Sequence, residues 1–450
     1  MEPVQFRSTN NKSSIVSLKE ALLTGQAPDK GLYMPTSFPK FSQEELTSLK
    51  KMPYWEVAFT VINKFASTVI SEERIRSICE EIYDFEVPLE HVKANLFVLR
   101  LDRGPTASFK DFAAKMMGKL IGFFAQEMEG NLTILTATSG DTGSAIANAF
   151  YGLSKIKIVV LFPIDEVSIR QRKQMTTLGK NVTTIAINGK FDDCQAIVKQ
   201  AFSDPAVKSI RLSSANSINV GRLLPQICYY VYSFVQVSRN NDPIVFAVPS
   251  GNFGNLMGGL IAREMGVPIS RFVVATNTND EVPRFFDSGI YEKVSPSRVC
   301  LSNAMNVGHP SNLARLVDLY GGRMDETGKL LKPPDMGKIK RDLFAISIDD
   351  ELTKKTIYEA YKTDKIILEP HGAVAWAGLK RLLETGEVGP TTPAISVSTA
   401  HPAKFPEQIK SILKIDPSPP PCLEGIEDRS ESFLTMSSNY EEFREWLANR

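Results

Sequence analysis

The spacing of hydrophobic positions changes once along the 450-residue chain, near residue 95. Before that point, stretches such as SLKEALLTG and SEERIRSICEEIY repeat apolar residues at helical spacing, with Pro and Gly between them in GLYMPTSFPKF. From NLFVLRLD onward, short β-branched runs alternate with longer helical patterns. The chain is therefore predicted to begin with a mainly helical domain, residues 1–95, and to continue as parallel sheets covered by helices.

Four strand-to-helix units are clear in the second part of the chain. NLTILTA precedes SAIANAFYG, KIVVLFP precedes VSIRQRKQMTTLG, NVTTIAI precedes FDDCQAIVKQAF, and PIVFAVP precedes LMGGLIAREMG. We expect an α/β fold with at least two sheets, divided into a large domain (residues 96–125 and 216–410) and a small domain (residues 126–215). Residues 411–450 contain the Pro-rich KIDPSPPPCLEG and the acidic helical pattern NYEEFREWLANR, and are predicted to form a C-terminal tail and helix.

Two of these units carry a glycine-rich loop between strand and helix, TSGDTG at 138–143 and SGNFGN at 250–255. Free amides and the dipole at a helix start attract anions, and glycine lets the backbone approach a ligand closely. Each loop is a candidate anion site, although ordinary turns of this kind use Gly and Asn for conformational reasons alone. Neither loop matches the GxxxxGK[ST] pattern of ATP sites or the GxGxxG pattern of dinucleotide sites.

The segment GPTASFKD, residues 104–111, contains a lysine in an unusual position. Ser108 followed by Asp111 is a capping-box-like pattern, which predicts that Lys110 lies in the first turn of a helix. The helix dipole and partial burial would both lower its pKa, as an amine that forms a Schiff base requires. Lys115, by contrast, is spaced for an ion pair with Asp111. Taken alone, Lys110 is better explained as a lysine that packs its stem and keeps its amine in water.

Charge and composition exclude several classes of function. The 52 Lys and Arg residues balance 51 Asp and Glu residues, so no overall positive charge is available for nucleic acid or an acidic membrane surface. The N-terminal MEPVQFRSTN resembles neither a secretory signal nor a transit peptide, and ICYYVYSFVQV is too short to cross a bilayer. We expect a cytoplasmic protein without nucleic-acid or membrane partners.

Metal and thiol chemistry have no support in the sequence. The five cysteines are scattered without a CxxC pair, and the four histidines occur without HExxH spacing, so no metal site is predicted. The two candidate anion loops and the candidate reactive lysine instead match what pyridoxal 5'-phosphate and an amino-acid substrate require together.

The ordered motifs resemble the threonine synthase family of fold-type II pyridoxal-phosphate enzymes, whose fold is similar to the tryptophan synthase β subunit. GPTASFKD resembles its cofactor-lysine segment, ATSGDTGSA its substrate-carboxylate loop, PSGNFGN its cofactor-phosphate loop and STAHPAKF its motif near the pyridine ring. Similarity continues through YMP, QMTTL, FDDCQAIVK, NSINVGRLLPQICYY and LEPHGAVA, up to about residue 410. The N-terminal region is similar to the microbial and fungal branch.

The resemblance implies how the cofactor would be bound. Lys110 would form the Schiff base and later move protons, Thr399 would bind the pyridine nitrogen, and Asp141 would lie on the side of the ring 3-hydroxyl. The phosphate group would be held mainly by backbone amides of Gly251, Asn252, Phe253, Gly254 and Asn255.

Substrate-binding residues are implied in the same way. Ser139 and Thr142 would meet the substrate carboxylate, whereas Asn216, Asn219 and Arg222 would bind its phosphate. A structural salt bridge is the alternative for Arg222. Packed, hydrogen-bonded histidines are the better interpretation of His309 and His371.

The implied activity is that of a carbon-oxygen lyase acting on phosphates, which converts O-phospho-L-homoserine and water into L-threonine and phosphate, the last step of threonine biosynthesis. A monomer or a homodimer is expected. Two alternatives stay open at this point: a related phospho-lyase that releases a 2-oxo acid, ammonia and phosphate, and a metabolite-binding homologue without catalysis.

Overall fold

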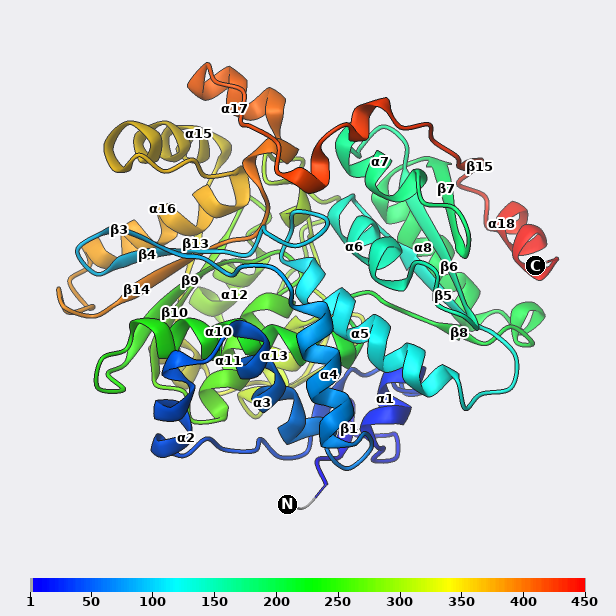
Figure 1. The fold of residues 1–450 in the computed structure, drawn as a ribbon, viewed down its shortest axis with the longest axis horizontal. Helices are drawn as coiled ribbons and strands as arrows, with labels where there is room; N and C mark the ends of the chain where they lie inside the picture. Colours follow the sequence, from blue (N-terminus) through cyan, green and yellow to red (C-terminus); the bar gives the residue numbers. More distant parts are fainter. Residues whose placement is uncertain (1–2, 450) are drawn as a thin grey trace.

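Two sheets form the frame of the computed structural model, which describes residues 3–449 (Figure 1). The larger sheet has six strands in the order β13-β10-β9-β14-β4-β3, all parallel except β3, which pairs antiparallel with β4. Its central strands β9 and β14 are buried on both faces; the sequence of β9 is a continuous apolar run, whereas β14 contains two serines. The six strands are β13 (Leu343–Ser347), β10 (Ile269–Thr276), β9 (Ile244–Pro249), β14 (Ala394–Ser398), β4 (Leu96–Arg100) and β3 (Leu89–Lys93).

The smaller sheet has five parallel strands in the order β15-β7-β6-β5-β8. It lies beside the larger sheet, on the right in Figure 1. Its strands are β15 (Leu434–Ser437), β7 (Val182–Asn188), β6 (Ile156–Pro163), β5 (Leu132–Ala137) and β8 (Leu212–Ser213).

Helices cover both sheets, as an alternating strand and helix pattern requires. Around the larger sheet, α16 packs on β14, β10 and β9, while α10 packs against α11. The helices of this part are α9 (Val220–Leu223), α10 (Pro225–Val237), α11 (Gly254–Glu264), α12 (Glu281–Ser288), α13 (Leu313–Leu319), α14 (Met336–Asp342), α15 (Asp350–Glu359), α16 (Pro370–Glu384) and α17 (Pro406–Leu413), with the short strands β11 (Arg323–Met324) and β12 (Leu330–Lys332).

Around the smaller sheet, α8 packs on β5 and β6, and α6 packs between α5 and α7. The four helices are α5 (Lys110–Ala125), α6 (Asp141–Phe150), α7 (Ile169–Thr176) and α8 (Phe191–Ser203).

The N-terminal region is mainly helical and packs under the larger sheet, where α3 contacts α10. It also contains an antiparallel strand pair, β1 with β2. One apolar cluster runs from Phe6 through Phe162 to Phe246, so this region and both sheets share a continuous core. Its elements are β1 (Phe6–Ser8), α1 (Leu18–Thr24), β2 (Tyr33–Pro35), α2 (Gln43–Ser48), α3 (Tyr54–Ala66) and α4 (Glu72–Ile82).

The C-terminal segment is joined to the smaller sheet. Strand β15 pairs with β7, and α18 (Tyr440–Ala448) packs against α8 (Figure 1). The sequence pattern did not predict this strand, because LTMS is short and mostly exposed. The division of the chain at residues 95, 125, 215 and 410 stays a prediction.

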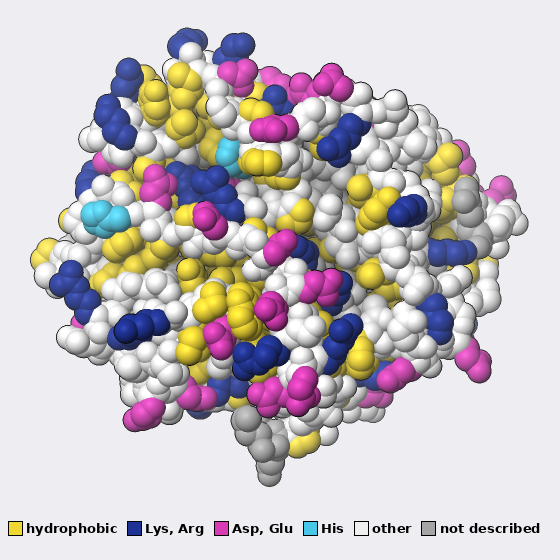
Figure 2. Space-filling view, viewed as in Figure 1, with side chains coloured by type: hydrophobic (Ala, Val, Ile, Leu, Met, Phe, Trp, Pro, Cys, Tyr) yellow, Lys and Arg dark blue, Asp and Glu magenta, His cyan; other side chains and the backbone are white. Residues whose placement is uncertain are grey.

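One face of the molecule is mixed in charge. On the face drawn in Figure 2, Lys and Arg side chains are interspersed with Asp and Glu side chains. Within residues 3–449, no helix is long and apolar enough to cross a membrane.

Candidate active site

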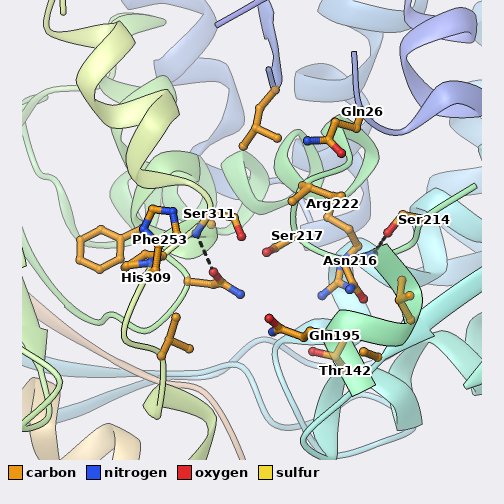
Figure 3. A pocket seen from close by; sticks show the side chains of 18 of the residues that line it. Gln26, Thr142, Gln195, Ser214, Asn216, Ser217, Arg222, Phe253, His309 and Ser311 are labelled. Atoms are coloured by element: carbon orange, nitrogen blue, oxygen red, sulfur yellow. Dashed lines mark hydrogen bonds between the residues drawn. The ribbon is translucent and has the colours of Figure 1, made fainter. Parts of the chain in front are cut away.

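A cavity of about 1310 Å³ opens at the carboxyl ends of strands β5, β9 and β14, where the two sheets face the N-terminal region (Figure 3). Ligands of parallel α/β proteins bind at this edge of a sheet. Nearly all the residues that the sequence assigned to cofactor or substrate line this single cavity: Lys110, Ser139, Asp141, Thr142, Asn216, Arg222, Gly251, Asn252, Phe253, Gly254, Asn255 and Thr399. His309 and His371 also line it.

Asn219 is the exception, because its side chain is committed elsewhere. Its Oδ1 accepts from the Gly221 amide at 2.8 Å and so caps α9, while its Nδ2 donates to the Leu22 and Ser214 carbonyls at 2.9 and 3.0 Å. The structure thus gives Asn219 a structural role, tying α1 to the segment before α9, in place of the predicted substrate contact.

Lys110 begins α5 as predicted, but the capping arrangement around it differs. Ser108 pairs its backbone with Ala400 in a β-bridge, and its buried hydroxyl has no hydrogen-bond partner among residues 3–449. The Asp111 carboxylate instead accepts from the Thr106 amide at 2.9 Å and hydroxyl at 2.6 Å. The predicted capping box of Ser108 and Asp111 is therefore wrong, because Phe109 is the residue before the helix and the Asp111 carboxylate is bound by Thr106.

The ion pair predicted between Lys115 and Asp111 is also absent. The Lys115 Nζ lies 3.2 Å from an Asp84 carboxylate oxygen at the surface. Asp111 is buried, which raises its pKa, and its oxygens are engaged by Thr106. Lys115 therefore pairs with Asp84 in place of Asp111, with its side chain 19% exposed.

Lys110 itself lies in the cavity wall with its side chain only 12% exposed. Burial lowers its pKa, and the positive charges of Arg222 and Lys404 lower it further, while Asp141 and Glu369 oppose the shift. The Lys110 Nζ is 3.7 Å from the Asp141 Oδ2. The amine is thus poised to lose its proton more easily than a solvated lysine, as a Schiff-base lysine must.

Asp141 lies near two lysines, Lys110 and Lys404. Burial alone would raise its pKa, but Lys404 and Lys110 outweigh burial and hold the pKa well below its usual range. The Asp141 Oδ1 lies 2.7 Å from the Lys404 Nζ and accepts from the Gln171 Nε2 at 2.8 Å. Sequence reasoning missed Lys404 and Gln171 as site residues; the signal for Lys404 was its place within STAHPAKF.

The loop 250–255 leaves its backbone open to the cavity. Phe253 adopts a left-handed conformation with φ of 64°, and α11 begins at the next residue, Gly254. The first amides of a helix have no carbonyl partner within it. A Cβ on Gly251 would come within 2.9 Å of the Ala304 carbonyl oxygen, so the tight course of this loop requires glycine there.

Asn252 and Asn255 support this loop with their side chains. The Asn252 Oδ1 accepts from the Ser311 amide at 2.9 Å (dashed in Figure 3). The Asn255 Oδ1 accepts from the hydroxyls of Tyr229 and Tyr230 at 2.6 and 2.8 Å. Its buried Nδ2 has no partner among residues 3–449, which leaves a hydrogen-bond donor available to a ligand.

The loop 138–143 is closed in part by its own side chain. The Thr138 Oγ1 accepts from the amides of Gly140 and Gly143 at 2.9 and 2.7 Å. Ser139 and Thr142 line the cavity beside Asp141. The loop therefore offers fewer free amides than the loop 250–255 and carries a charge of its own.

Arg222 is buried in the cavity wall without a salt bridge to any carboxylate in residues 3–449. Its Nη1 donates to the Ala215 carbonyl at 2.9 Å, its Nε is unpartnered, and burial lowers its pKa to about 10. In Figure 3, Asn216 and Arg222 lie on the side of the cavity where Thr142 also lies. A buried guanidinium without a counter-ion is suited to an anionic ligand.

Thr399 is positioned by a carboxylate that the sequence did not single out. The Thr399 amide donates to the Glu369 Oε1 at 3.3 Å, and Glu369 also caps α16 by accepting from the amides of His371 and Gly372. The His371 Nδ1 lies 2.7 Å from the Glu369 Oε2, and its Nε2 accepts from the Ala304 amide at 3.1 Å. His371 is thus a buried, hydrogen-bonded histidine.

His309 lies on the other side of the cavity in Figure 3, near Phe253. Its Nδ1 is 2.7 Å from the Tyr291 hydroxyl, and burial lowers its pKa. A neutral, hydrogen-bonded imidazole follows from these contacts.

Three known protein families match the chain, together over residues 5–446. Residues 81–399 match the family described as "Pyridoxal-phosphate dependent enzyme". Residues 5–83 match "Threonine synthase N terminus", and residues 372–446 match "Threonine synthase, C-terminal".

Individual relatives agree with these matches. The chain is 39% identical to threonine synthase of Escherichia coli (strain K12) over 88% of both chains, and 37% identical to that of Serratia marcescens over 96% of both. Its fold superposes on a PLP-bound threonine synthase from Brucella melitensis with a TM-score of 0.92, at 32% identity and over 99% of both chains. The yeast threonine synthase structure gives 0.89, at 29% identity and over 98% of both. The chain belongs to the threonine synthase family of pyridoxal-phosphate-dependent enzymes.

Proposed function

We propose that this protein is a threonine synthase, which converts O-phospho-L-homoserine and water into L-threonine and inorganic phosphate. One observation carries the proposal: the desolvated amine of Lys110 and the unpaired guanidinium of Arg222 line the same cavity. An amino-acid substrate with a phosphate group needs both, and the membership of the chain in the family supports the assignment.

The residues of the cavity fit pyridoxal 5'-phosphate. The open amides at the start of α11 and the unpartnered Asn255 Nδ2 would hold its phosphate, and Lys110 would bind its aldehyde carbon. Thr399 lies in the same cavity and would face the pyridine nitrogen. When bound, this cofactor supplies an electron sink that stabilises negative charge on substrate carbons.

The chain's own groups supply binding and proton transfer. Lys110, with its lowered pKa, would take protons from the substrate carbons and return them, since burial makes its Nζ easier to deprotonate than that of a solvated lysine. Arg222 and Asn216 would bind the substrate phosphate before and after it leaves, and Ser139 and Thr142 would bind the carboxylate. Asp141 would stay ionised beside Lys110.

Phosphate release and threonine formation, measured together on purified protein with O-phospho-L-homoserine, test the proposal. Lys110→Ala should lower turnover by about 10³-fold or more and abolish the visible absorbance of the bound cofactor. Lys119→Ala is the matched control, because Lys119 lies on the same helix but pairs with Glu81 at the surface. Phosphate release with a 2-oxo acid in place of threonine would instead favour the phospho-lyase, and cofactor binding without phosphate release would favour a non-catalytic homologue.

We also propose that the enzyme acts in the cytoplasm as a monomer or a homodimer. All five cysteines are free, and four of them are buried, which suits a reducing compartment. Light scattering of the purified protein across a concentration series would distinguish the two assemblies, and a larger particle would contradict both.

A further inference from the structure

Lys404 is a buried lysine that has no role in the reaction proposed above. It closes the 3₁₀ turn Pro402–Lys404 that follows β14, and its side chain is 0% exposed. A lysine buried in this way is costly unless its ammonium group is paired. The Nζ has two partners, the Asp141 Oδ1 at 2.7 Å and the Thr106 carbonyl at 2.8 Å.

These partners belong to two different segments of the chain, and of the two only Asp141 lines the cavity. Asp141 is the first residue of α6, which packs on the smaller sheet, whereas Thr106 lies in the segment that leads into Lys110. The Thr106 amide and hydroxyl in turn hold the Asp111 carboxylate of α5. Lys404 therefore connects α6 to the start of α5 through one ammonium group.

The Asp141 carboxylate lies between two lysines at unequal distances. Its Oδ1 is 2.7 Å from the Lys404 Nζ, while its Oδ2 is 3.7 Å from the Lys110 Nζ. A third partner, the Gln171 Nε2, binds Oδ1 at 2.8 Å and leaves Oδ2 on the side of Lys110. The tighter ion pair is thus the one with Lys404.

We infer that Lys404 is a positioning residue, which holds the Asp141 carboxylate back from a closed ion pair with Lys110 and anchors the segment before Lys110 through Thr106. The inference rests on the proposed function only in taking Lys110 as the cofactor lysine. Lys404 touches neither the reacting atoms nor the substrate groups assigned above, so it acts through Asp141 and Thr106.

Four charged groups act on the Lys110 amine. Asp141 and Glu369 favour its protonated form, whereas Arg222 and Lys404 favour its neutral form. Lys404→Met removes one of the two opposing cations and also frees Asp141 to pair with Lys110. Both consequences raise the pKa of Lys110, and Asp141→Asn lowers it.

The test is the pH midpoint of the Lys110 nitrogen, measured on the full chain in two states. The visible absorbance of the cofactor-bound protein, titrated with pH, reports this nitrogen while it is bonded to the cofactor, and acetylation reports it as a free amine. The rate of Lys110 acetylation by acetic anhydride, read by peptide mass spectrometry, is followed with pH on protein stripped of cofactor. Lys404→Met should move both midpoints up by about one pH unit, and Asp141→Asn should move them down.

Two further variants separate charge from packing. Lys404→Arg keeps the positive charge and should bring the midpoints back toward the parent, whereas Lys410→Met, on the exposed face of α17, should leave them unchanged. A folded Lys404→Met protein with the midpoints of the parent would overturn the inference. If Lys404→Met does not fold, an Asp141→Asn protein with unmoved midpoints overturns it equally.

The two measurements also keep this inference separate from the proposed function. A parent protein without a lysine-dependent visible band would refute the cofactor assignment, but acetylation of Lys110 would still report the effect of Lys404. Conversely, a normal band with unmoved midpoints in the variants would leave the proposed function standing and remove the positioning role.

Discussion

The two glycine-rich loops of the cavity are alike in sequence but differ in what they present to a ligand. The loop 138–143 joins β5 to α6, and the loop 250–255 joins β9 to α11. In the first, Thr138 occupies two amides and Asp141 adds a carboxylate that is bound to Lys404. In the second, no side chain is acidic, and the first amides of α11 stay open to the cavity.

The difference shows what a glycine-rich strand-to-helix loop can and cannot indicate. Both loops have the exposed backbone that predicted an anion site. The side chains of each turn determine its charge. The loop 250–255 has open amides that can bind an anion, whereas the loop 138–143 places the Asp141 carboxylate beside Lys110 and Lys404. Of two similar backbone motifs, one therefore offers uncharged amide donors to the cavity and the other adds a negatively charged side chain.

The largest expected effect comes from placing a carboxylate in the loop 250–255, like the one that Asp141 gives to the loop 138–143. Asn255→Asp keeps an acceptor for the Tyr229 and Tyr230 hydroxyls but places a carboxylate where the cofactor phosphate would bind. We expect cofactor affinity to fall by about 100-fold or more, which corresponds to roughly 2.7 kcal/mol. Titration of the apoprotein with pyridoxal 5'-phosphate, followed by absorbance, measures this loss.

The control for this variant is an Asn→Asp change away from the cavity. Asn449 on the exposed C-terminal side of α18 donates to the Glu445 carbonyl, and Asn449→Asp should leave cofactor affinity unchanged. Equal affinities for Asn255→Asp and the parent would show that the loop 250–255 is not the phosphate site.

A smaller effect, on the free energy of unfolding, should follow from removing the side-chain oxygen that caps the loop 138–143. Thr138→Val removes the oxygen that accepts from Gly140 and Gly143 and leaves two amides without that partner. The free energy of unfolding should fall by about 2 kcal/mol, as measured by urea denaturation. Thr136→Val, in the strand β5 that precedes the loop, is the matched control, because the Thr136 hydroxyl is buried with no partner in residues 3–449. Equal losses in the two variants would contradict the capping role of Thr138.

The fold class could be predicted because its signal is local and repeated. The strands β5, β6, β7 and β9 are largely buried and appear in the sequence as short runs rich in apolar and β-branched residues before helical patterns. Strand β15 lacks that signal, since only Met436 of its four residues is buried. Its place at the sheet edge depends on pairing with β7, which no local pattern encodes.

The candidate site was predictable to the extent that its groups have local signals. Lys110 stood out from its place at a helix start, and the two loops stood out from their glycines. Lys404 and Glu369 had only their places within STAHPAKF and LEPHGAVA as a signal, because no local pattern indicates that either residue is buried until the chain folds. The cap predicted from Ser108 is wrong because Phe109 precedes the helix and the buried Ser108 hydroxyl has no partner among residues 3–449.

The smallest expected effect is a dependence of the free energy of unfolding on pH. Only the loop 138–143 should cause it, since the loop 250–255 has no titratable side chain. Lys404 and Lys110 outweigh burial and depress the pKa of Asp141 in the folded protein. A depressed carboxyl pKa contributes stability above its unfolded value, and this contribution is lost as pH falls. Between pH 5 and pH 3, the parent should therefore lose about 1 kcal/mol more unfolding free energy than Asp141→Asn.

Asp141→Asn is expected to start from a lower stability at pH 5, because Lys404 is then buried without its counter-ion. Urea denaturation at the two pH values measures the difference, with Asp84→Asn at the surface as the control that should follow the parent. Parallel losses in the parent and Asp141→Asn would mean that Asp141 is not held ionised by its lysines, and the contrast between the two loops would then rest on backbone geometry alone.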